Sequence, residues 1–202
     1  MKLYYAPSAC SISPHVALIE AGLPFELVRV DFMRGKKLPD GRDLSAVSSK
    51  AYVPVLELDD GQILTEGAVM VQYIADRAPA AKLAPPNGTF ERVRLQELLH
   101  FIATELHKGM TPLFSKVPNE EYKQVAIERV KSRLALVSQE LGNRPFIFGD
   151  SFTIADGYLF YILRTWTKNF KGELPGNLVE YYARIAERPS MKAALSAEGI
   201  SA

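Results

Sequence analysis

The stretch Tyr4-Tyr5-Ala6-Pro7-Ser8-Ala9-Cys10-Ser11-Ile12-Ser13-Pro14 decides how the rest of the chain is interpreted. It joins an apolar run, residues 1–5, to a helical pattern whose first turn contains Pro14, where proline is tolerated. A thiol at such a turn faces the unpaired N–H groups and positive dipole end of the helix, which favour the reactive thiolate. Cys10 is the only cysteine, and a lone cysteine is more often a small buried hydrophobe. Both interpretations stay open at this point.

The composition is that of an ordinary globular protein. Of 202 residues, 48% are hydrophobic and 23% are charged, which fits one or two domains. The net charge of +1 does not indicate nucleic acid or an anionic membrane as a partner. A single cysteine excludes an internal disulfide and fits a reducing compartment. The first residues lack the apolar segment of a signal peptide and no run of about 20 apolar residues follows, so we expect a cytoplasmic protein.

Residues 1–80 alternate between strand and helix patterns. Strands are expected at 2–5 and 25–30, separated by a helix at 14–21 that Gly22 ends. Residues 33–50 form a loop with one short helix, and a hairpin around an Asp-Gly turn pairs 52–58 with 62–65. A helix over 66–77 completes the order β-α-β-α-β-β-α. Its expected apolar face contains Ala68, Val69, Met70, Tyr73 and Ile74. The first two strands of this order should be parallel, joined by a right-handed crossover.

A composition break follows. Residues 78–88 contain three prolines and a glycine and are typical of a linker. Beyond them the periodicity is helical. Helices are expected over 89–114, with a bend or stop near Gly109 and Pro112, and over 119–141, with Tyr122 on its apolar stripe. Further helices are expected after the capping pair Thr153 and Asp156, and over 178–187 and 191–195. The prediction is therefore an α/β domain at 1–80 and an all-α domain at 87–202.

The β-α-β-α-β-β-α order with a cysteine before the first helix is the thioredoxin-like plan. The segment Cys10-Ser11-Ile12-Ser13 lacks a second cysteine, so the chain cannot close its own disulfide. This disfavours dithiol redox chemistry and leaves chemistry with an external thiol such as glutathione. At Val53-Pro54 a cis peptide bond would turn the Val53 backbone toward an extended peptide, although an edge-strand proline is the more frequent case.

Two further segments contain candidate site residues. Glu66-Gly67 begins a helix, whose free N–H groups can bind a carboxylate while Glu66 holds an ammonium; helix capping alone is the simpler interpretation. His107 follows Thr104 on a helix and could hold or accept a proton, or be a solvated surface histidine. His15 and His100 are weaker candidates. The three histidines lack metal-ligand spacing, so we expect no metal.

Several longer matches lead to one family: KLYYAPSACSISPHVAL, YVPVLELDDGQILTEGAVMVQYIAD, IATELHKGMTPLF, FTIADGYLF and AERPSMKAALSAEG. With these segments, the chain resembles the beta-class glutathione S-transferases, bacterial cytosolic enzymes with a cysteine in the active site. The resemblance implies a homodimer of two-domain subunits, with glutathione bound as co-substrate in the thioredoxin-like domain. It also implies a hydrophobic electrophile as second substrate and no metal.

The resemblance also assigns residues to the site. Cys10 would contact the glutathione sulfur, and a loop lysine, Lys36 or its neighbour Lys37, would contact the peptide. The Val53 backbone before cis-Pro54 would pair with the cysteinyl part, while Glu66 and Gly67 would hold the γ-glutamyl end. Gly67 stands where family members often have serine, which leaves only its backbone N–H as a donor.

The helical domain would add residues of its own. Thr104 to His107 would lie near the thiol, with Glu105 reaching the ligand of the neighbouring subunit. His100 stands where relatives often have asparagine and would be a further contact. Other classes of the family use a tyrosine or serine near the N-terminus, so Tyr5 or Ser11 could replace Cys10 and rank below it. Ser11 would also contact glutathione.

Three functions remain open from the sequence. The first is attack of the bound glutathione thiolate on hydrophobic electrophiles, with Cys10 and His107 flanking the sulfur. The second is disulfide exchange through a Cys10–glutathione mixed disulfide. The third is a non-catalytic protein that binds glutathione or hydrophobic ligands. The electrophile is expected in a pocket between the domains, with Phe114, Tyr158 and Trp166 as candidate lining residues.

Overall fold

The computed structural model describes residues 1–116 and 119–202, which form two compact units. The first unit contains residues 1–84 and 187–202, and the second contains residues 85–186. The sequence division had placed the last 16 residues of the first unit with the helical domain. They contain helix α7 (Pro189–Glu198), which packs against α1 (Ile12–Glu20) of the first unit.

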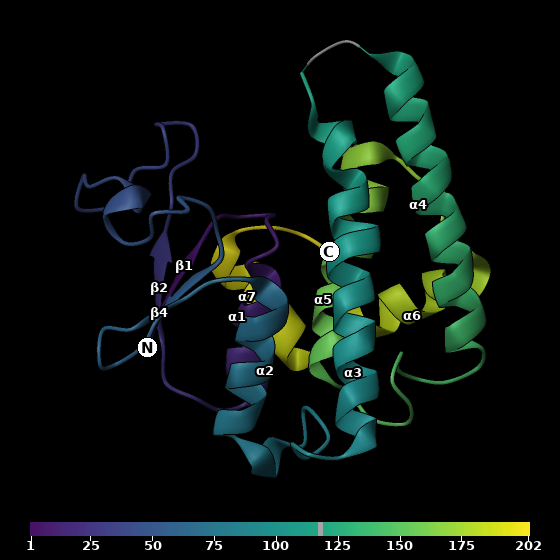
Figure 1. Cartoon of the computed structure of the whole chain (residues 1–202), viewed down its shortest axis with the longest axis horizontal. Coiled ribbons are helices and arrows are strands. Elements are labelled where there is room, and N and C mark those ends of the chain that lie inside the picture. The colour runs from purple at the N-terminus through teal and green to yellow at the C-terminus, as the bar shows by residue number, and fades with distance from the viewer. Residues whose placement is uncertain (117–118) are drawn as a thin grey trace. The chain divides into compact units, whose positions relative to one another are not determined.

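The first unit contains the sheet strands labelled in Figure 1. They belong to a mixed four-stranded sheet, in which the first strand of the chain lies between the second and the third, and the fourth is at the edge beside the third. The central strand β1 (Lys2–Tyr5) runs parallel to β2 (Glu26–Arg29) and antiparallel to β3 (Val55–Glu57), which pairs with β4 (Ile63–Leu64). The parallel first pair and the later hairpin are both confirmed. The thioredoxin-like order predicted from the sequence is therefore the observed one.

Two helices of this unit pack against each other, α1 and α2 (Gly67–Arg77). The predicted apolar face of α2 was wrong at Val69, which is 48% exposed, whereas Val71 is fully buried. The reason is that Met70, Val71 and Ile74 face the core at the observed helix phase. The loop between β2 and β3 contains a short 3₁₀ helix, η1 (Leu44–Ala46), and another, η2 (Pro79–Ala81), follows α2.

Helix α7 is tied to α1 by two polar contacts. Arg188 donates to both carboxylate oxygens of Glu20, with the shortest N–O distance at 2.8 Å. His15 Nδ1 lies 2.9 Å from Glu198 Oε1, and both side chains are buried. His15 is thus a core residue of the first unit, and we do not assign it to a ligand site.

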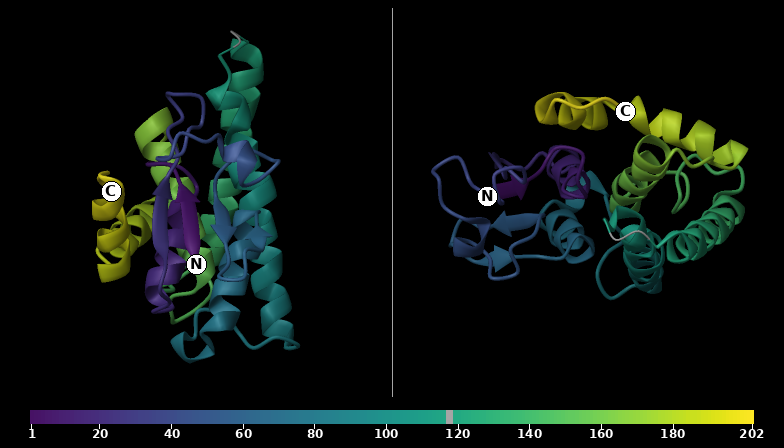
Figure 2. Two further views of the ribbon diagram at one scale, coloured as in Figure 1. Left: turned by 90° about the vertical axis from the view of Figure 1, so that its left-hand side faces the viewer. Right: turned by 90° about the horizontal axis from the view of Figure 1, so that it is seen from above.

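The second unit begins with a long helical run that changes its winding twice. The α-helix α3 (Phe90–Phe101) continues as a π-helical turn, η3 (Ile102–His107), and as a 3₁₀ segment, η4 (Lys108–Phe114), that contains Pro112. Helix α4 (Glu120–Leu141) runs beside it and begins at the Asn119 cap (Figures 1 and 2). The expected bend near Pro112 is therefore present as a change of helix type.

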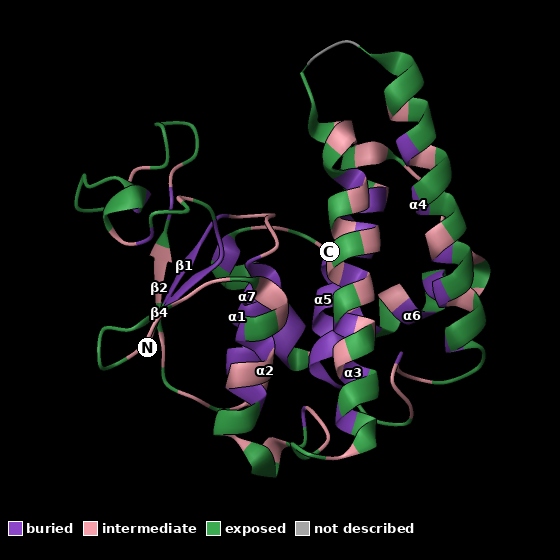
Figure 3. Cartoon of the chain, viewed as in Figure 1, coloured by how far each residue is buried: buried purple, intermediate pink, exposed green. Residues whose placement is uncertain are grey.

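Helix α5 (Ile154–Arg164) is the core of the second unit, and each of its residues is buried (Figure 3). Thr153 and Asp156 form the expected capping box at its start. A π-helical turn, η5 (Thr165–Asn169), follows, and then α6 (Gly176–Ala186). Tyr122 on α4 was expected to be buried but is 56% exposed, because it lies in the first turn of its helix. None of the described helices is long and apolar enough to cross a membrane.

Candidate functional site

The turn that carries Cys10 is held from within by Ser11. The Ser11 hydroxyl accepts a hydrogen bond from the Ala6 backbone N–H and donates one to the Ala6 carbonyl, each at 3.2 Å. Cys10 lies just before the helix, is partly exposed, and donates from Sγ to the Val53 carbonyl at 3.6 Å. The fold thus places the only thiol beside the Val53 backbone, 43 residues away in sequence.

The two other candidate nucleophiles of this turn fit a reactive role poorly. Ser11 is fully buried, and its hydroxyl bonds the turn, so it is poorly placed to act as a nucleophile. Its contact with glutathione stays a prediction. Tyr5 is 7% exposed. Burial raises the pKa of Tyr5, which opposes formation of a phenolate. Of the three residues, Cys10 is the one whose exposure suits chemistry with a second molecule.

The Val53-Pro54 peptide bond is cis. The sequence by itself favoured an edge-strand proline, while the family resemblance implied the cis form. Strand β3 begins at Val55, so both residues precede the strand rather than opening it. The Val53 carbonyl faces Cys10, and the Pro54 ring faces the start of α2.

Glu66 and Gly67 lie at the start of α2, next to Pro54. A Cβ atom built on Gly67 would lie 3.9 Å from Pro54 Cγ, so the two residues are neighbours in space. Glu66 is the N-cap residue and has a φ of 66°, a backbone region that is strained for a residue with a side chain. Strain of this kind is typical of ligand sites. The helix start offers N–H donors beside a carboxylate.

The structure separates the two candidate lysines of the loop. Lys36 Nζ donates to the Ala51 carbonyl at 2.7 Å, on the segment that leads into Val53. Lys37 Nζ instead pairs with Asp43 at 2.9 Å. Lys36 is therefore the lysine that contacts the segment leading into Val53.

In the helical unit, His107 occupies the end of the π-helical turn. Its Nδ1 lies 2.8 Å from Tyr158 Oη, and the rings of Tyr158 and Tyr161 contact it edge-on. Burial, with a smaller contribution from the charge of Lys108, lowers the pKa of His107 to about 4. His107 is consequently neutral at pH 7 and is held by α5, so it is not the solvated surface histidine that the sequence left as an alternative.

The neighbouring candidates on the same run have partners within the unit. Thr104 is exposed, and its hydroxyl donates to the His100 carbonyl at 2.9 Å. Glu105 accepts hydrogen bonds from Arg129 at 3.0 Å and from Arg133 at 2.9 Å. These hydrogen bonds lower the pKa of Glu105, and the bond from Arg133 has the larger effect. The predicted contact of Glu105 with a ligand of a neighbouring subunit stays a prediction. His100 is an exposed side chain on α3, and its contact with glutathione also stays a prediction.

Sequence reasoning missed three residues that the structure adds to these groups. Lys50 and Tyr52 both donate to the carboxylate of Glu66. Tyr161 contacts His107 from α5. The positions of Lys50 and Tyr52 just before Val53 could have drawn attention to them. No sequence signal indicated Tyr161, because its contact depends on how α5 packs against η3.

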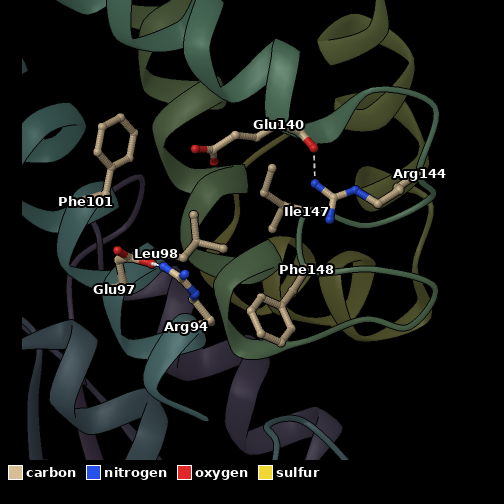
Figure 4. A pocket seen from close by; sticks show the side chains of 8 residues that line it. All are labelled: Arg94, Glu97, Leu98, Phe101, Glu140, Arg144, Ile147 and Phe148. Carbon is tan, nitrogen blue, oxygen red and sulfur yellow. Dashed lines mark hydrogen bonds and ion pairs between the residues drawn. The ribbon is translucent and has the colours of Figure 1, made fainter. Parts of the chain in front are cut away.

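The helical unit also has a cavity of about 520 Å³ between α3, the end of α4 and the segment that follows it (Figure 4). Leu98, Phe101 and Ile147 give it apolar walls. Arg94 and Glu97 form an ion pair of 2.7 Å at its side. None of the predicted site residues lines this cavity. No group of three metal-ligating side chains occurs within residues 1–116 and 119–202.

Comparison with known protein families finds a match for each half of the chain. The glutathione S-transferase N-terminal domain family matches residues 7–77, and the C-terminal domain family matches residues 104–198. The chain belongs to the glutathione S-transferase family. Glutathione S-transferase GstA of Escherichia coli O157:H7 is 46% identical over 202 residues, which cover 99% of this chain and 100% of the relative.

Solved glutathione S-transferases give the same result in three dimensions. The structure described as a ternary complex of BphK, a bacterial glutathione S-transferase, has a TM-score of 0.95 at 46% identity and covers 99% of this chain and 100% of that chain. A sphingomonad glutathione S-transferase complexed with glutathione has a TM-score of 0.93 at 41% identity and covers 100% of both chains. A Sphingomonas chungbukensis enzyme, 42% identical over 99% of this chain and 100% of that chain with a TM-score of 0.93, is described as beta class.

The beta-class resemblance is thereby confirmed. This glutathione S-transferase is an enzyme with glutathione as its co-substrate, rather than a non-catalytic binding protein. The comparisons assign the family and the class of reaction. The roles of individual residues follow from the geometry above, and we treat them as proposals.

Proposed function

We propose that glutathione binds along the first unit with its sulfur at Cys10, its cysteinyl backbone at Val53 and its γ-glutamyl end at Glu66 and Gly67. The observation that carries this proposal is the spatial sequence of these residues. Cys10 Sγ contacts the Val53 carbonyl, and Pro54 neighbours Gly67. Lys36 donates to the carbonyl of Ala51, two residues before Val53. A peptide with a central thiol matches this order of groups.

The reaction supported by this arrangement is attack of the glutathione thiolate on electrophilic carbon in a hydrophobic substrate. The thiol gives up its proton, the sulfur forms a bond to carbon, and the leaving group departs with its electron pair. Lowering the pKa of a bound thiol by about two units requires roughly 2.7 kcal/mol. A helix start and two or three hydrogen bonds supply interactions of that size.

A second reaction uses Cys10 itself as nucleophile. The Cys10 thiolate attacks a disulfide of glutathione, the disulfide bond breaks, and one glutathione leaves as thiolate while the other is bonded to Cys10. A second thiol must then resolve this mixed disulfide, because Cys10 is the only cysteine. The partly exposed position of Cys10 favours this reaction.

One experiment tests the site and the thiol chemistry together. The intact mass of the protein, incubated with oxidised glutathione, should increase by one glutathionyl group and return to its original value with a reductant. The Cys10→Ser variant, which offers no thiol, is the control and should show no increase. Absence of an adduct on the wild-type protein would reject Cys10 as a nucleophile toward disulfides.

A comparison of two activities separates the two reactions. The Cys10→Ser variant should lose disulfide exchange completely, because no mixed disulfide can form. If Cys10 only steadies the glutathione sulfur during conjugation, the same variant keeps a reduced conjugating activity. Unchanged disulfide exchange in this variant would contradict the proposed role of Cys10.

His107 is proposed as a neutral polar group that acts on the thiol or on the substrate. Its low pKa keeps the ring uncharged at pH 7, so it can accept a proton or a hydrogen bond. Tyr158 fixes the ring through Nδ1. A drop in kcat for the His107→Gln variant, with glutathione binding unchanged, would support this role. Unchanged kcat would reject it.

We also propose that the enzyme is a cytoplasmic homodimer associating through α3 and α4. Both helices present large exposed apolar side chains: Phe90 is 66% exposed, Val93 51% and Val125 61%. Apolar exposure on neighbouring helices is typical of an interface between subunits. Light scattering at micromolar concentration should give twice the mass of the chain. A monomeric mass would reject the dimer.

A further inference from the structure

The carboxylate of Glu66 is held by two side chains that the proposed site does not yet use. Lys50 Nζ donates to Glu66 Oε1 at 2.8 Å and to Thr65 Oγ1 at 2.9 Å. Tyr52 Oη donates to the same Glu66 oxygen at 2.5 Å. Lys50 Nζ also lies 5.8 Å from the centre of the Tyr52 ring. These residues form a connected group, which we call the Glu66 cluster: Lys50, Tyr52, Thr65 and Glu66.

Stability of the fold does not explain this cluster well. The side chains of Lys50 and Glu66 are 46% and 55% exposed, and exposed ion pairs contribute little to folding. Glu66 is nevertheless held in a strained backbone conformation at the start of α2. A strained residue whose carboxylate is oriented by two donors is better explained by a ligand that this carboxylate must meet.

The ligand assigned to this place has a matching pair of charges. The γ-glutamyl end of glutathione carries an α-ammonium and an α-carboxylate on one carbon. Glu66 complements the ammonium, and the helix start at Gly67 complements the carboxylate. Lys50 adds a positive charge beside Glu66, at 2.8 Å from its carboxylate. The cluster therefore contains both signs of charge, as a zwitterion requires.

We infer that Lys50 and Tyr52 are specificity-determining residues: Lys50 recognises the α-carboxylate of the γ-glutamyl group, and Tyr52 orients Glu66 toward its α-ammonium. This inference rests on the proposed binding of glutathione along the first unit. The Lys50 ammonium contacts Thr65 and Glu66, yet its side chain is 46% exposed, so a ligand carboxylate can reach it from solvent. Tyr52 has one hydroxyl donor, and it is committed to Glu66.

The inference distinguishes two halves of one ligand, so it is tested with two peptides that each lack one half. Glutaryl-cysteinylglycine lacks the α-ammonium, and 4-aminobutyryl-cysteinylglycine lacks the α-carboxylate. Isothermal titration calorimetry on the full chain gives Kd for glutathione and both peptides. The variants are Lys50→Met, which keeps the length of the side chain, and Tyr52→Phe, which keeps the ring.

Lys2→Met serves as the matched control. Lys2 forms an exposed ion pair with Glu57 in the same unit, and its side chain is 46% exposed, as that of Lys50 is. This variant should leave all three Kd values unchanged. Circular dichroism and the melting temperature of each variant establish that the fold is retained.

The expected result is a split between the two peptides. Lys50→Met should weaken glutathione and the glutaryl peptide about three- to tenfold and leave the 4-aminobutyryl peptide within about twofold, as loss of one solvent-screened hydrogen bond at an exposed site implies. Tyr52→Phe should weaken glutathione and the 4-aminobutyryl peptide about threefold, with the glutaryl peptide unchanged. This opposite pattern is one that a purely structural role would not produce.

Three results would overturn the inference. Equal weakening of all three ligands by Lys50→Met would make Lys50 a structural residue. Tighter binding of glutathione by that variant would make Lys50 a competitor of the ligand ammonium for Glu66. If the wild-type protein binds glutathione but the two variants do not affect the two peptides differently, this inference alone is refuted. If the wild-type protein binds no glutathione, the proposed site is refuted together with it.

Discussion

Acid should destabilise this protein through His107, by an amount that follows from its burial. The pKa of His107 is lowered to about 4 in the folded chain, chiefly by burial, from 6.5 for an exposed histidine. The unfolded chain therefore takes up a proton on this residue at a higher pH than the folded chain does. Stability from the neutral ring is fully present above pH 6.5 and is lost as the pH falls toward 4.

The size of the effect follows from the two pKa values. Between pH 7 and pH 5, the free energy of unfolding should fall by about 2 kcal/mol through His107 alone. The limiting loss, reached below pH 4, is roughly 3.4 kcal/mol. A loss of this size is a substantial part of the stability of a typical domain.

The assay is urea unfolding at several pH values, followed by the fluorescence of Trp166, the only tryptophan, which is buried in the same unit. His107→Gln removes the titrating ring and keeps a side chain that can bond to Tyr158. His100→Gln removes an exposed histidine from the same helical run and is the matched control. Between pH 7 and pH 5, His107→Gln should lose about 2 kcal/mol less than the wild type, while His100→Gln should follow the wild type.

Equal losses in the wild type and in His107→Gln would refute the reasoning. That result would mean that the ring is protonated in the folded chain at pH 5 and that burial between Tyr158 and Tyr161 does not keep it neutral. The proposed role of His107 as a neutral group in the reaction would then fail in the acid range too.

Three further changes should alter stability in the stated directions. Asp156→Ala leaves the N–H groups of Ile147 and Thr153 and the buried Tyr181 hydroxyl without their acceptor. The free energy of unfolding, measured in urea, should therefore fall by about 3 kcal/mol. A loss below about 1 kcal/mol would contradict the capping argument. Gly172→Ala would place a Cβ atom 2.0 Å from Trp166 Cε2. The melting temperature should therefore drop, and the fluorescence emission of Trp166 should shift. An unchanged emission spectrum would show that this close contact is absent in solution. Glu20→Gln weakens the paired hydrogen bonds from Arg188 that tie α7 to α1 and should cost about 1 kcal/mol, with no change expected if this pair is fully solvated.

The local pattern was sufficient to predict most elements. The strand at β1, the helix ended near Gly22, the Asp-Gly hairpin and the capping pair Thr153 and Asp156 all depend on neighbours within a few residues. The errors have a common physical reason. Val69 and Tyr122 fit an apolar stripe by spacing, but which side of a helix is buried depends on what packs against it.

The candidate site divides in the same way. Cys10, Glu66 and Gly67 could be named from the sequence because a thiol before a helix and a carboxylate at a helix start are local features. The cluster of Lys50 and Tyr52 on Glu66, and the contacts of Tyr161 with His107, depend on tertiary packing. The same packing buries Ser11 in its turn.

The sequence by itself determined the thioredoxin-like order of the first unit, the helical character of the second, and the presence of one thiol at a helix start. These features follow from short-range rules of periodicity, capping and turn chemistry. Only the tertiary structure decided that Cys10 meets Val53 and that Glu66 is held by Lys50 and Tyr52. It also decided that His107 is half-buried against α5 and neutral. These properties depend on distance and solvent exposure, which are set when segments far apart in the chain pack together.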